Sequence, residues 1–383
     1  MSSEPDVPIT PSSPPSAPPD GARLRRSPLF EVTQARGAKF TEFGGWEMPL
    51  RFGSELAEHR AVREAAGLFD LSHMAQLDLV GPGSGPGLDY ALLGRHSSMP
   101  LGRASYSMIL AEDGGVIDDL IVYRLGEEHY FVISNASNRE VVVDALALRL
   151  EKFETHLSDV TAKRALIAVQ GPRAGQIMRA VGATAADDLG YYRATETTLV
   201  ERPVILARTG YTGEDGFEVS IDRDAAPALW ALLEGAGQPF GLVPVGLAAR
   251  DTLRLEAAMP LYGHELDLST TPYEGGQGAF VRDKTVDFVG GAGLAGRPPR
   301  KHLVGLVGEG RRAAREGYPV MVDGQVVGRI TSGALSPTLG YPIALASLSG
   351  AAPPPGSVVE VDIRGKLTPF RVTQLPFYTK EKK

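Results

Sequence analysis

Two adjacent carboxylates, Asp118 and Asp119, interrupt an otherwise apolar run at residues 116–122. Neighbouring side chains of a β-strand point to opposite faces, so one of the two can face a cleft while the other faces away from it. A carboxylate in a cleft can accept or return a proton during a reaction, and its burial is costly unless something there requires its charge. The alternative is a turn-stabilising pair directly after Gly114 and Gly115, and the local pattern leaves both interpretations open.

A second candidate is the glycine-rich segment at residues 208–218, which has the sequence RTGYTGEDGFE. Glycine lets the backbone approach a flat ligand closely, and Tyr211 offers an aromatic ring for stacking. Glu218 follows Phe217 at the start of a predicted strand over residues 217–221, so these two side chains are expected on opposite faces. A glycine-rich hairpin with surface charges is the alternative interpretation.

A third candidate is a predicted helix at residues 246–257, with the sequence GLAARDTLRLEA, which ends before Pro260. Arg250 and Arg254 are four residues apart and share a face, where like charges repel unless an anion lies between them. Alternatively, the two arginines are solvated or form salt bridges with Asp251 and Glu256.

The elements that must position these residues follow no regular βαβ alternation, which favours an α+β fold over a doubly wound sheet. Apolar periodicity and turn signals predict helices over residues 55–68, where Gly67 supplies the stop, 138–150 and 171–180, and strands over residues 75–79, 106–110, 116–123, 129–134 and 165–169. A Gly/Pro/Arg-rich stretch at residues 290–300 has the composition of a linker. Beyond it, short strands predict an all-β domain, a small barrel, over residues 303–307, 320–322, 326–331, 343–347, 358–363 and 370–374.

Composition excludes several kinds of chemistry. The 383 residues include no cysteine, which rules out disulfides, thiolate metal sites and cysteine nucleophiles. The seven histidines lack the spacing of zinc sites, and no P-loop or dinucleotide fingerprint occurs. A formal charge of −7 argues against a nucleic-acid partner, and no apolar run approaches the roughly 18 residues of a membrane span. Residues 1–28 are proline-rich with few apolar side chains, so we expect a disordered leader there.

Taken in order, the candidate segments and several others resemble the T-protein of the glycine cleavage system, a tetrahydrofolate-dependent aminomethyltransferase family. The resemblance covers nearly the whole chain after the leader. It is carried by residues 43–49 (FGGWEMP), 67–74 (GLFDLSHM), 115–122 (GVIDDLIV), 166–172 (LIAVQGP), 208–218, 246–256 and 330–340 (ITSGALSPTLG).

The resemblance implies a three-domain, cloverleaf-like α+β fold with folate at its centre, over residues 29–290 as two intertwined subdomains, and a C-terminal β-barrel over residues 300–379. The implied reaction takes the one-carbon unit from an aminomethyl group on the lipoyl arm of the H-protein. Tetrahydrofolate, the co-substrate, receives it, giving 5,10-methylenetetrahydrofolate, ammonia and dihydrolipoyl H-protein. We accordingly expect a cytoplasmic enzyme whose partner is lipoylated H-protein, with no metal, nucleic acid or membrane.

The resemblance also implies roles for individual residues. Asp119 matches the catalytic aspartate, placed near folate N10, which leaves Asp118 a structural role. Glu218 matches the carboxylate that accepts the pterin 2-amino group and N3–H, and Arg250 matches an arginine that contacts substrate. Further positions at the folate site are matched by Tyr106, Tyr192, Tyr211, Val122 and Asn135. This chain departs from many members at Gly278-Ala279-Phe280, where they carry an aromatic residue that Phe280 could replace only with a change of register. The C-terminal Phe377-Tyr378 is shared with some members.

Two relatives of this family are alternatives. One is a folate-binding protein without the transferase activity, although the branch that assists iron–sulfur assembly carries a cysteine signature that this chain lacks. The other is a free-standing subunit of a folate-dependent demethylase. The fused demethylases carry a flavin domain, for which this chain has neither the length nor the fingerprint.

Overall fold

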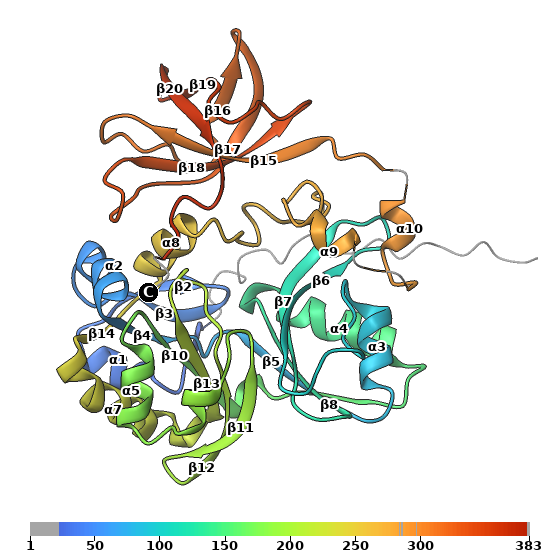
Figure 1. Ribbon diagram of the computed structural model, residues 1–383, viewed down its shortest axis with the longest axis vertical. Helices are drawn as coiled ribbons and strands as arrows, with labels where there is room; N and C mark the ends of the chain where they lie inside the picture. Colours follow the sequence, from blue (N-terminus) through green and yellow to red (C-terminus); the bar gives the residue numbers. More distant parts are fainter. Residues whose placement is uncertain (1–22, 283, 285, 296, 381–383) are drawn as a thin grey trace, which may run out of the picture.

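The computed structural model describes residues 23–282, 284, 286–295 and 297–380. Within them the fold is mixed α+β, as predicted, with two open sheets, a small three-stranded sheet and a closed barrel. In Figure 1 the barrel lies above the two open sheets, and helix α8 (Leu247–Glu256) lies between the barrel and one of them.

The first open sheet has six strands in the order β11-β12-β13-β10-β4-β14. The chain enters it through β4, leaves to build the second sheet, and returns through β10, so the two halves are intertwined. Its strands are β4 (Ala66–Asp70), β10 (Arg164–Gln170), β11 (Ala194–Leu199), β12 (Arg202–Ala207), β13 (Gly216–Asp222) and β14 (Leu242–Pro244). Helices α5 (Ala174–Ala180) and α7 (Ala226–Gly237) pack on it around a core that includes the fully buried Ile177 and Trp230.

The second open sheet has five strands in the order β6-β7-β8-β5-β9. These are β5 (Ala75–Val80), β6 (Ala104–Leu110), β7 (Val116–Arg124), β8 (His129–Ser134) and β9 (His156–Asp159). Helices α3 (Ser84–Ala91) and α4 (Arg139–Leu150) cover one face, where Leu88 and Leu146 are fully buried. The opposite face is left to the interior of the molecule.

The predicted C-terminal barrel is confirmed as a closed barrel of six strands in the order β15-β18-β17-β16-β19-β20. Its strands are β15 (Lys301–Gly308), β16 (Pro319–Val322), β17 (Gln325–Leu335), β18 (Pro342–Ser349), β19 (Val358–Ile363) and β20 (Lys366–Thr373). Ile330, Val361 and Phe370 are buried in its core. Strand β17 continues past the predicted end at residue 331, and β20 begins four residues before the predicted start at residue 370.

A disordered leader is predicted over residues 1–28. Residues 1–22 lie outside the described residues, whereas residues 25–28 belong to the fold. Strand β1 (Arg25–Arg26) pairs with β3 (Trp46–Arg51), which also pairs with β2 (Lys39–Phe43). The hydroxyl of Ser27 donates to the buried carboxylate of Asp70 at 2.5 Å. Helix α1 (Phe30–Ala35) follows directly.

The helix predicted over residues 55–68 is too long. Helix α2 (Glu55–Glu64) ends at Glu64, and residues 66–70 form β4. These five residues are all buried and pair with β10 and β14, so tertiary pairing overrides the helical spacing. Gly67 is needed for packing, because a Cβ there would lie 2.6 Å from Val62 Cγ2.

The remaining helices are short. They are α6 (Ala185–Asp188), α9 (Gly278–Arg282) and α10 (Gly291–Leu294), with the 3₁₀ turns η1 (Ala136–Asn138), η2 (Thr161–Lys163), η3 (Arg223–Ala225) and η4 (Gln238–Phe240). The stretch at residues 290–300, predicted as a linker, thus contains the single turn α10.

Candidate active site

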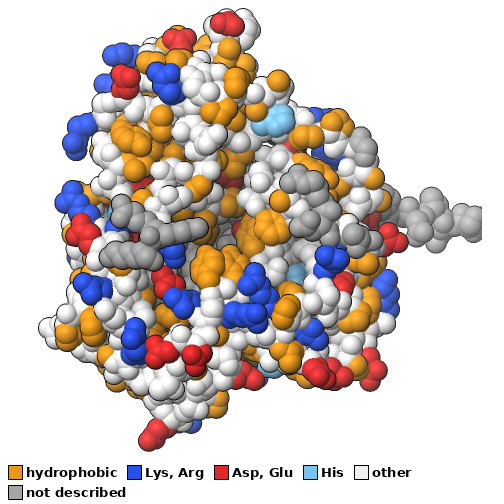
Figure 2. Space-filling view, in the orientation of Figure 1, with side chains coloured by type: hydrophobic (Ala, Val, Ile, Leu, Met, Phe, Trp, Pro, Cys, Tyr) orange, Lys and Arg blue, Asp and Glu red, His pale blue; other side chains and the backbone are white. Residues whose placement is uncertain are grey.

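A cavity of about 640 Å³ is lined by both open sheets, the loop before β13, helix α8 and the segment after it. Near the centre of the face in Figure 2, apolar side chains are exposed below the barrel. Seven of the eight residues singled out from the sequence line the cavity, although they come from distant parts of the chain: Tyr106, Asp119, Asn135, Tyr192, Tyr211, Glu218 and Arg250.

Asp119 reaches the cavity because of its place in β7. It pairs with Met108 of β6, and its side chain points to the face of the sheet that the covering helices leave open. The hydroxyl of Tyr106 donates to Asp119 Oδ2 at 2.9 Å, and Asn135 Nδ2 donates to Oδ1 at 2.8 Å. Burial raises the pKa of Asp119, and these two hydrogen bonds offset that effect only in part. The carboxyl is therefore held in a fixed orientation and takes up a proton more readily than an exposed aspartate.

Asp118 points away from the cavity and is fully buried. Its Oδ1 accepts hydrogen bonds from the side-chain amides of Asn135 at 2.8 Å and Asn138 at 2.7 Å, and its Oδ2 accepts from the backbone N–H of Asn135 at 2.9 Å. Burial and the neighbouring Asp119 raise its pKa. Asp118 thus fixes the start of the turn that carries Asn135, which in turn contacts Asp119.

Tyr106 and Phe280 form an aromatic wall beside Asp119, with ring centroids 5.4 Å apart at 56°. Burial, and then the charge of Asp119, raise the pKa of Tyr106 well above its ordinary value, so its hydroxyl keeps the proton that it donates. The expectation that Phe280 reaches this wall only with a change of register relative to other members stays a prediction. Phe280 lies on the short helix α9 and lines the cavity, whereas Ala279 does not.

Glu218 lies on β13 and is 7% exposed. Its Oε2 accepts hydrogen bonds from Thr209 Oγ1 at 2.5 Å and from the Tyr123 hydroxyl at 3.4 Å. Tyr192 lines the cavity in a left-handed conformation with φ of 57°, and burial raises its pKa to about 12. Among the described residues, no hydrogen bond reaches Glu218 Oε1, so this oxygen retains accepting capacity toward the cavity.

Arg250 and Arg254, predicted on one face of a helix, both line the cavity from α8 but have different partners. Arg254 is buried and paired with Glu265 at 2.9 Å and Asp251 at 2.7 Å. The guanidinium of Arg250 lies 4.8 Å from the ring centroid of Tyr211, and no salt bridge to it occurs within the described chain. Burial lowers the pKa of Arg250, and the nearby Glu218 counteracts this effect.

Val122, one of the eight candidates, lies elsewhere in the structure. Its side chain is fully buried in the core between the five-stranded sheet and helices α3 and α4. Asp119 and Val122 are three residues apart in one strand and therefore face opposite ways, whereas Ile121 faces the cavity with Asp119. Tyr378 also lies outside the lining residues, and its ring stacks on Arg63 with the guanidinium 4.1 Å from the centroid.

Sequence reasoning missed several lining residues. His73 is 1% exposed, its Nδ1 has no partner among the described residues, and its ring packs edge-on against Phe43. Burial, and then the charge of Arg250, lower the pKa of His73 to about 3, so this imidazole is neutral at physiological pH. His73 and Phe43 belong to the motifs 67–74 and 43–49, which carried the family resemblance. Membership in those motifs was the sequence signal that could have identified them. Other missed lining residues are Leu50, Met74, Leu247, Met259 and Leu261.

Among the described residues, no group of three or more histidine, aspartate or glutamate side chains is arranged to hold a metal ion. No helix within the same residues has the length and apolar character needed to cross a membrane.

Comparison with known protein families accounts for most of the chain in two consecutive matches. Residues 29–285 match the GCVT N-terminal domain. Residues 301–379 match the glycine cleavage T-protein C-terminal barrel domain.

Individual relatives match over nearly their whole lengths. The chain is 51% identical over 366 residues to an aminomethyltransferase of Streptomyces avermitilis, covering 94% of this chain and 98% of the relative. It is 50% identical over 368 residues to that of Streptomyces coelicolor, covering 94% and 99%. The crystal structure of the glycine cleavage system aminomethyltransferase T from Bartonella henselae superimposes with a TM-score of 0.88 at 34% identity, covering 93% of this chain and 98% of that one. The chain therefore belongs to the glycine cleavage T-protein family of aminomethyltransferases.

Proposed function

We propose that this protein transfers the one-carbon unit of an aminomethyl group, carried on the lipoyl arm of an H-protein, to tetrahydrofolate. The products are 5,10-methylenetetrahydrofolate, ammonia and the dihydrolipoyl carrier. We further propose that the reaction takes place in the cytoplasm and in the cavity described above. The observation that carries the proposal is the convergence of Asp119, Glu218 and Arg250, from three distant segments, on one aromatic-walled cavity.

The residues present fit a reduced folate. A cavity of about 640 Å³ lies within the roughly 300–1,000 Å³ of typical small-molecule sites. The rings of Tyr106, Tyr192 and Tyr211 offer flat apolar surfaces for a pterin and a benzoyl ring. Glu218 offers a carboxylate that two parallel N–H donors of a pterin edge can share, with Thr209 and Tyr123 holding it in place.

Tetrahydrofolate would supply the nucleophilic amines that accept the one-carbon unit. The role we assign to Asp119 is to hold or accept a proton next to such an amine. Its raised pKa suits a group that exchanges protons, because an acid–base group works best with a pKa near the working pH. Tyr106 and Asn135 hold both oxygens, so the carboxyl needs little reorganisation during the reaction.

Arg250 is assigned the recognition of an anionic or carbonyl group of the ligand. It is half-buried and stacks on Tyr211, which orients the planar guanidinium toward the cavity without a competing salt bridge from the described residues. Asn135 is assigned the orientation of Asp119. Val122 carries no role in the proposed site, because its side chain lies in a different core.

The two alternative functions are less well supported. Relatives about 50% identical over 98–99% of their lengths are named aminomethyltransferase, and the cavity retains a carboxyl at the proposed catalytic position. A free-standing demethylase subunit would use the same folate but would not require an aminomethylated lipoyl carrier. The donor therefore discriminates between these functions.

The test uses purified protein, aminomethylated H-protein and tetrahydrofolate, and measures ammonia and 5,10-methylenetetrahydrofolate. We expect the parent to form both products in equal amounts. Asp119→Asn should lower the rate at least about 100-fold, the lower range for a positioned acid–base group, with tetrahydrofolate affinity largely kept.

Asp78→Asn is the matched control, because Asp78 pairs with His129 on the same sheet and lies outside the cavity lining. It should retain the parent's rate. Unchanged turnover in Asp119→Asn would remove Asp119 from the mechanism. A parent that binds tetrahydrofolate but releases no ammonia from the loaded carrier would contradict the transferase function itself.

A further inference from the structure

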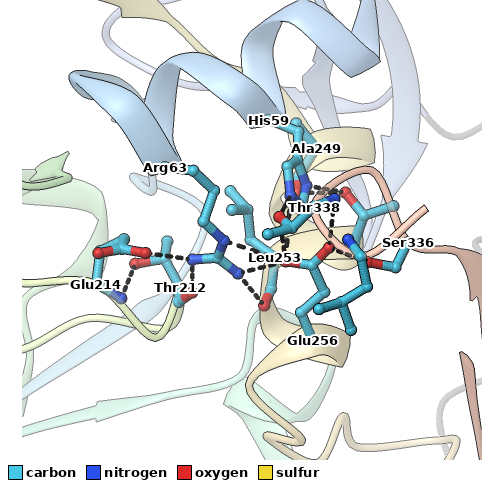
Figure 3. Close-up of polar contacts among 11 residues, drawn as sticks. His59, Arg63, Thr212, Glu214, Ala249, Leu253, Glu256, Ser336 and Thr338 are labelled. Atoms are coloured by element: carbon cyan, nitrogen blue, oxygen red, sulfur yellow. Dashed lines mark hydrogen bonds and ion pairs between the residues drawn. The ribbon is translucent and has the colours of Figure 1, made fainter. Parts of the chain in front are cut away.

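A network of charged and hydroxyl side chains joins α2, α8, the loop before β13 and the barrel (Figure 3), and it lies outside the residues that line the cavity. Its centre is Glu256, the last residue of α8, whose side chain is fully buried. Five other side chains of the network come from α2, the loop before β13 and the barrel loop after β17: His59, Arg63, Glu214, Ser336 and Thr338. None of these residues lines the cavity.

Helix α8 has two functional faces. Arg250 and Arg254, four residues apart, face the cavity. Thr252 and Glu256, also four apart, face the network, where Thr252 Oγ1 lies 2.8 Å from His59 Nδ1. Because all four residues lie on one helix, contacts that hold Thr252 and Glu256 in place also determine the position of Arg250 in the cavity.

The barrel loop after β17 contacts the network face of α8, and the backbone N–H of Tyr378, after the barrel strands, donates to the carbonyl of Glu256 at 2.9 Å. Ser336 Oγ donates to Glu256 Oε1 at 2.5 Å, and the backbone N–H of Thr338 donates to the same oxygen at 3.1 Å. Thr338 Oγ1 lies 2.8 Å from Glu256 Oε2 and 2.9 Å from His59 Nε2. Two residues of the barrel loop thus bind the end of α8 directly.

The network also reaches the second wall of the cavity. Arg63 donates to Glu256 Oε2 from Nε at 3.1 Å and from Nη2 at 2.8 Å. Its Nη1 donates to the carbonyl of Thr212 at 2.7 Å and pairs with Glu214 at 2.9 Å. Thr212 follows Tyr211, whose ring lines the cavity and whose hydroxyl donates to the carbonyl of Pro260.

A buried ion pair adds little net stability compared with apolar packing, since both charges lose their hydration. What it provides is a fixed geometry, because Oε1 of Glu256 accepts from Ser336 and Thr338 of the barrel loop, while Oε2 accepts from Thr338 and also from Arg63 of α2. We propose that Glu256 is a positioning residue through which the barrel loop at residues 336–338 sets the two cavity walls that carry Arg250 and Tyr211. This inference rests on the proposed function only in naming tetrahydrofolate as the ligand.

The test uses the full chain and variants of Thr338, which touches Glu256 but lies outside the cavity lining. Thr338→Val removes the hydroxyl and Thr338→Ser keeps it. Thr368→Val removes a barrel hydroxyl whose one hydrogen bond among the described residues goes to the carbonyl of Lys366. Amide hydrogen exchange is measured without ligand over residues 208–216 and α8. The dissociation constant is then measured by titration with tetrahydrofolate.

We expect Thr338→Val to speed exchange in both segments and to raise the dissociation constant roughly 2- to 30-fold, as for residues that carry coupling without touching a ligand. Thr338→Ser and Thr368→Val should stay within about twofold of the parent. Glu256→Gln should have the same effects on exchange and on the dissociation constant as Thr338→Val. The neutral amide has only one accepting oxygen and no charge to pair with Arg63, so it cannot keep the hydrogen bonds of both Arg63 and Ser336.

Exchange unchanged over both segments in Thr338→Val and Glu256→Gln, with only a lower melting temperature, would overturn the proposal and leave the network a purely structural role. A parent that does not bind tetrahydrofolate would contradict the proposed function instead. The exchange measurements would still decide whether the barrel loop positions the two walls.

Discussion

The side chains of the consecutive residues Asp118 and Asp119 lie in different environments. Asp118 accepts hydrogen bonds from Asn135 and Asn138 inside the protein, whereas Asp119 lines a cavity and is held by Tyr106 and Asn135. Burial raises the pKa of both. Only Asp119 combines that shift with access to a ligand, which is why we assign it the proton transfer.

The pH dependence of a Tyr106 variant tests the assignment of proton transfer to Asp119. The hydrogen bond from the Tyr106 hydroxyl to Asp119 stabilises the ionised carboxylate and so lowers the pKa of that group. Tyr106→Phe should therefore raise the pKa of Asp119 further, and the acidic limb of the pH dependence of kcat/KM should move to higher pH. Tyr130→Phe, which removes a hydroxyl outside the cavity, is the control. A limb that stays in place, or that moves to lower pH, would contradict the role of Tyr106.

Glu218 tests recognition rather than chemistry. Glu218→Ala should weaken tetrahydrofolate binding by roughly 1–3 kcal/mol, the cost of losing a buried charge-assisted pair, or about 5- to 150-fold in dissociation constant. Glu196→Ala, at an exposed position of β11, two strands away from β13 in the same sheet, should bind as the parent does. Equal titration curves for Glu218→Ala and the parent would refute the assignment.

Strand β7 explains at the level of one element why neighbouring residues differ in role. Asp119, Ile121 and Tyr123 face the interior of the molecule, Val122 packs under helices α3 and α4, and Leu120 belongs to that core but also borders the cavity. The strand therefore serves the cavity with one face and the stability of the sheet with the other. A shift of one residue in its pairing with β6 would exchange the two faces.

Alanine substitutions on the two faces should have separable effects. Val122→Ala should lower the free energy of unfolding by about 1–3 kcal/mol, because it leaves a cavity in the core, and should keep tetrahydrofolate affinity. Ile121→Ala should weaken tetrahydrofolate binding up to about tenfold, from lost apolar contact, with a smaller loss of stability. Urea unfolding and ligand titration measure the two quantities. Equal effects of both variants on affinity would contradict the orientation of β7.

At the scale of the whole molecule, α8 contacts α2, β3 and the barrel strands β17 and β18. Glu256 connects the barrel to the rest through Arg63, Ser336 and Thr338. Burial alone would raise its pKa, but hydrogen bonds and charge from His59, Ser336 and Arg63 outweigh burial and lower it to about 2. The depressed pKa means that ionised Glu256 stabilises the assembled molecule.

Acid should weaken this assembly within a defined range. A carboxylate with a depressed folded-state pKa contributes its stability above its unfolded value of 4.5, and loses it as the pH falls toward about 2. The shift corresponds to about 3 kcal/mol at 1.36 kcal/mol per pH unit. Urea midpoints of the parent and of Glu256→Gln should therefore differ most above pH 4.5 and converge as the pH falls. A difference that stays constant down to pH 3 would contradict this linkage.

Local sequence patterns were enough to predict many of the strands, the C-terminal barrel and the family. Alternating apolar residues gave β7 and β8, turn signals and short strands gave the barrel, and the ordered motifs gave the family. The placement of Asp118 and Asp119 on opposite faces also followed from the sequence, because strand alternation is a property of the backbone.

Only tertiary structure decided which face of β7 lies against the cavity. That choice places Val122 in the core and Ile121 in the cavity lining. Tertiary structure likewise ended α2 at Glu64, where pairing with β10 and β14 is stronger than helical propensity, and it brought Glu256 to the barrel loop. These outcomes depend on contacts between residues far apart in the chain, which local spacing does not encode.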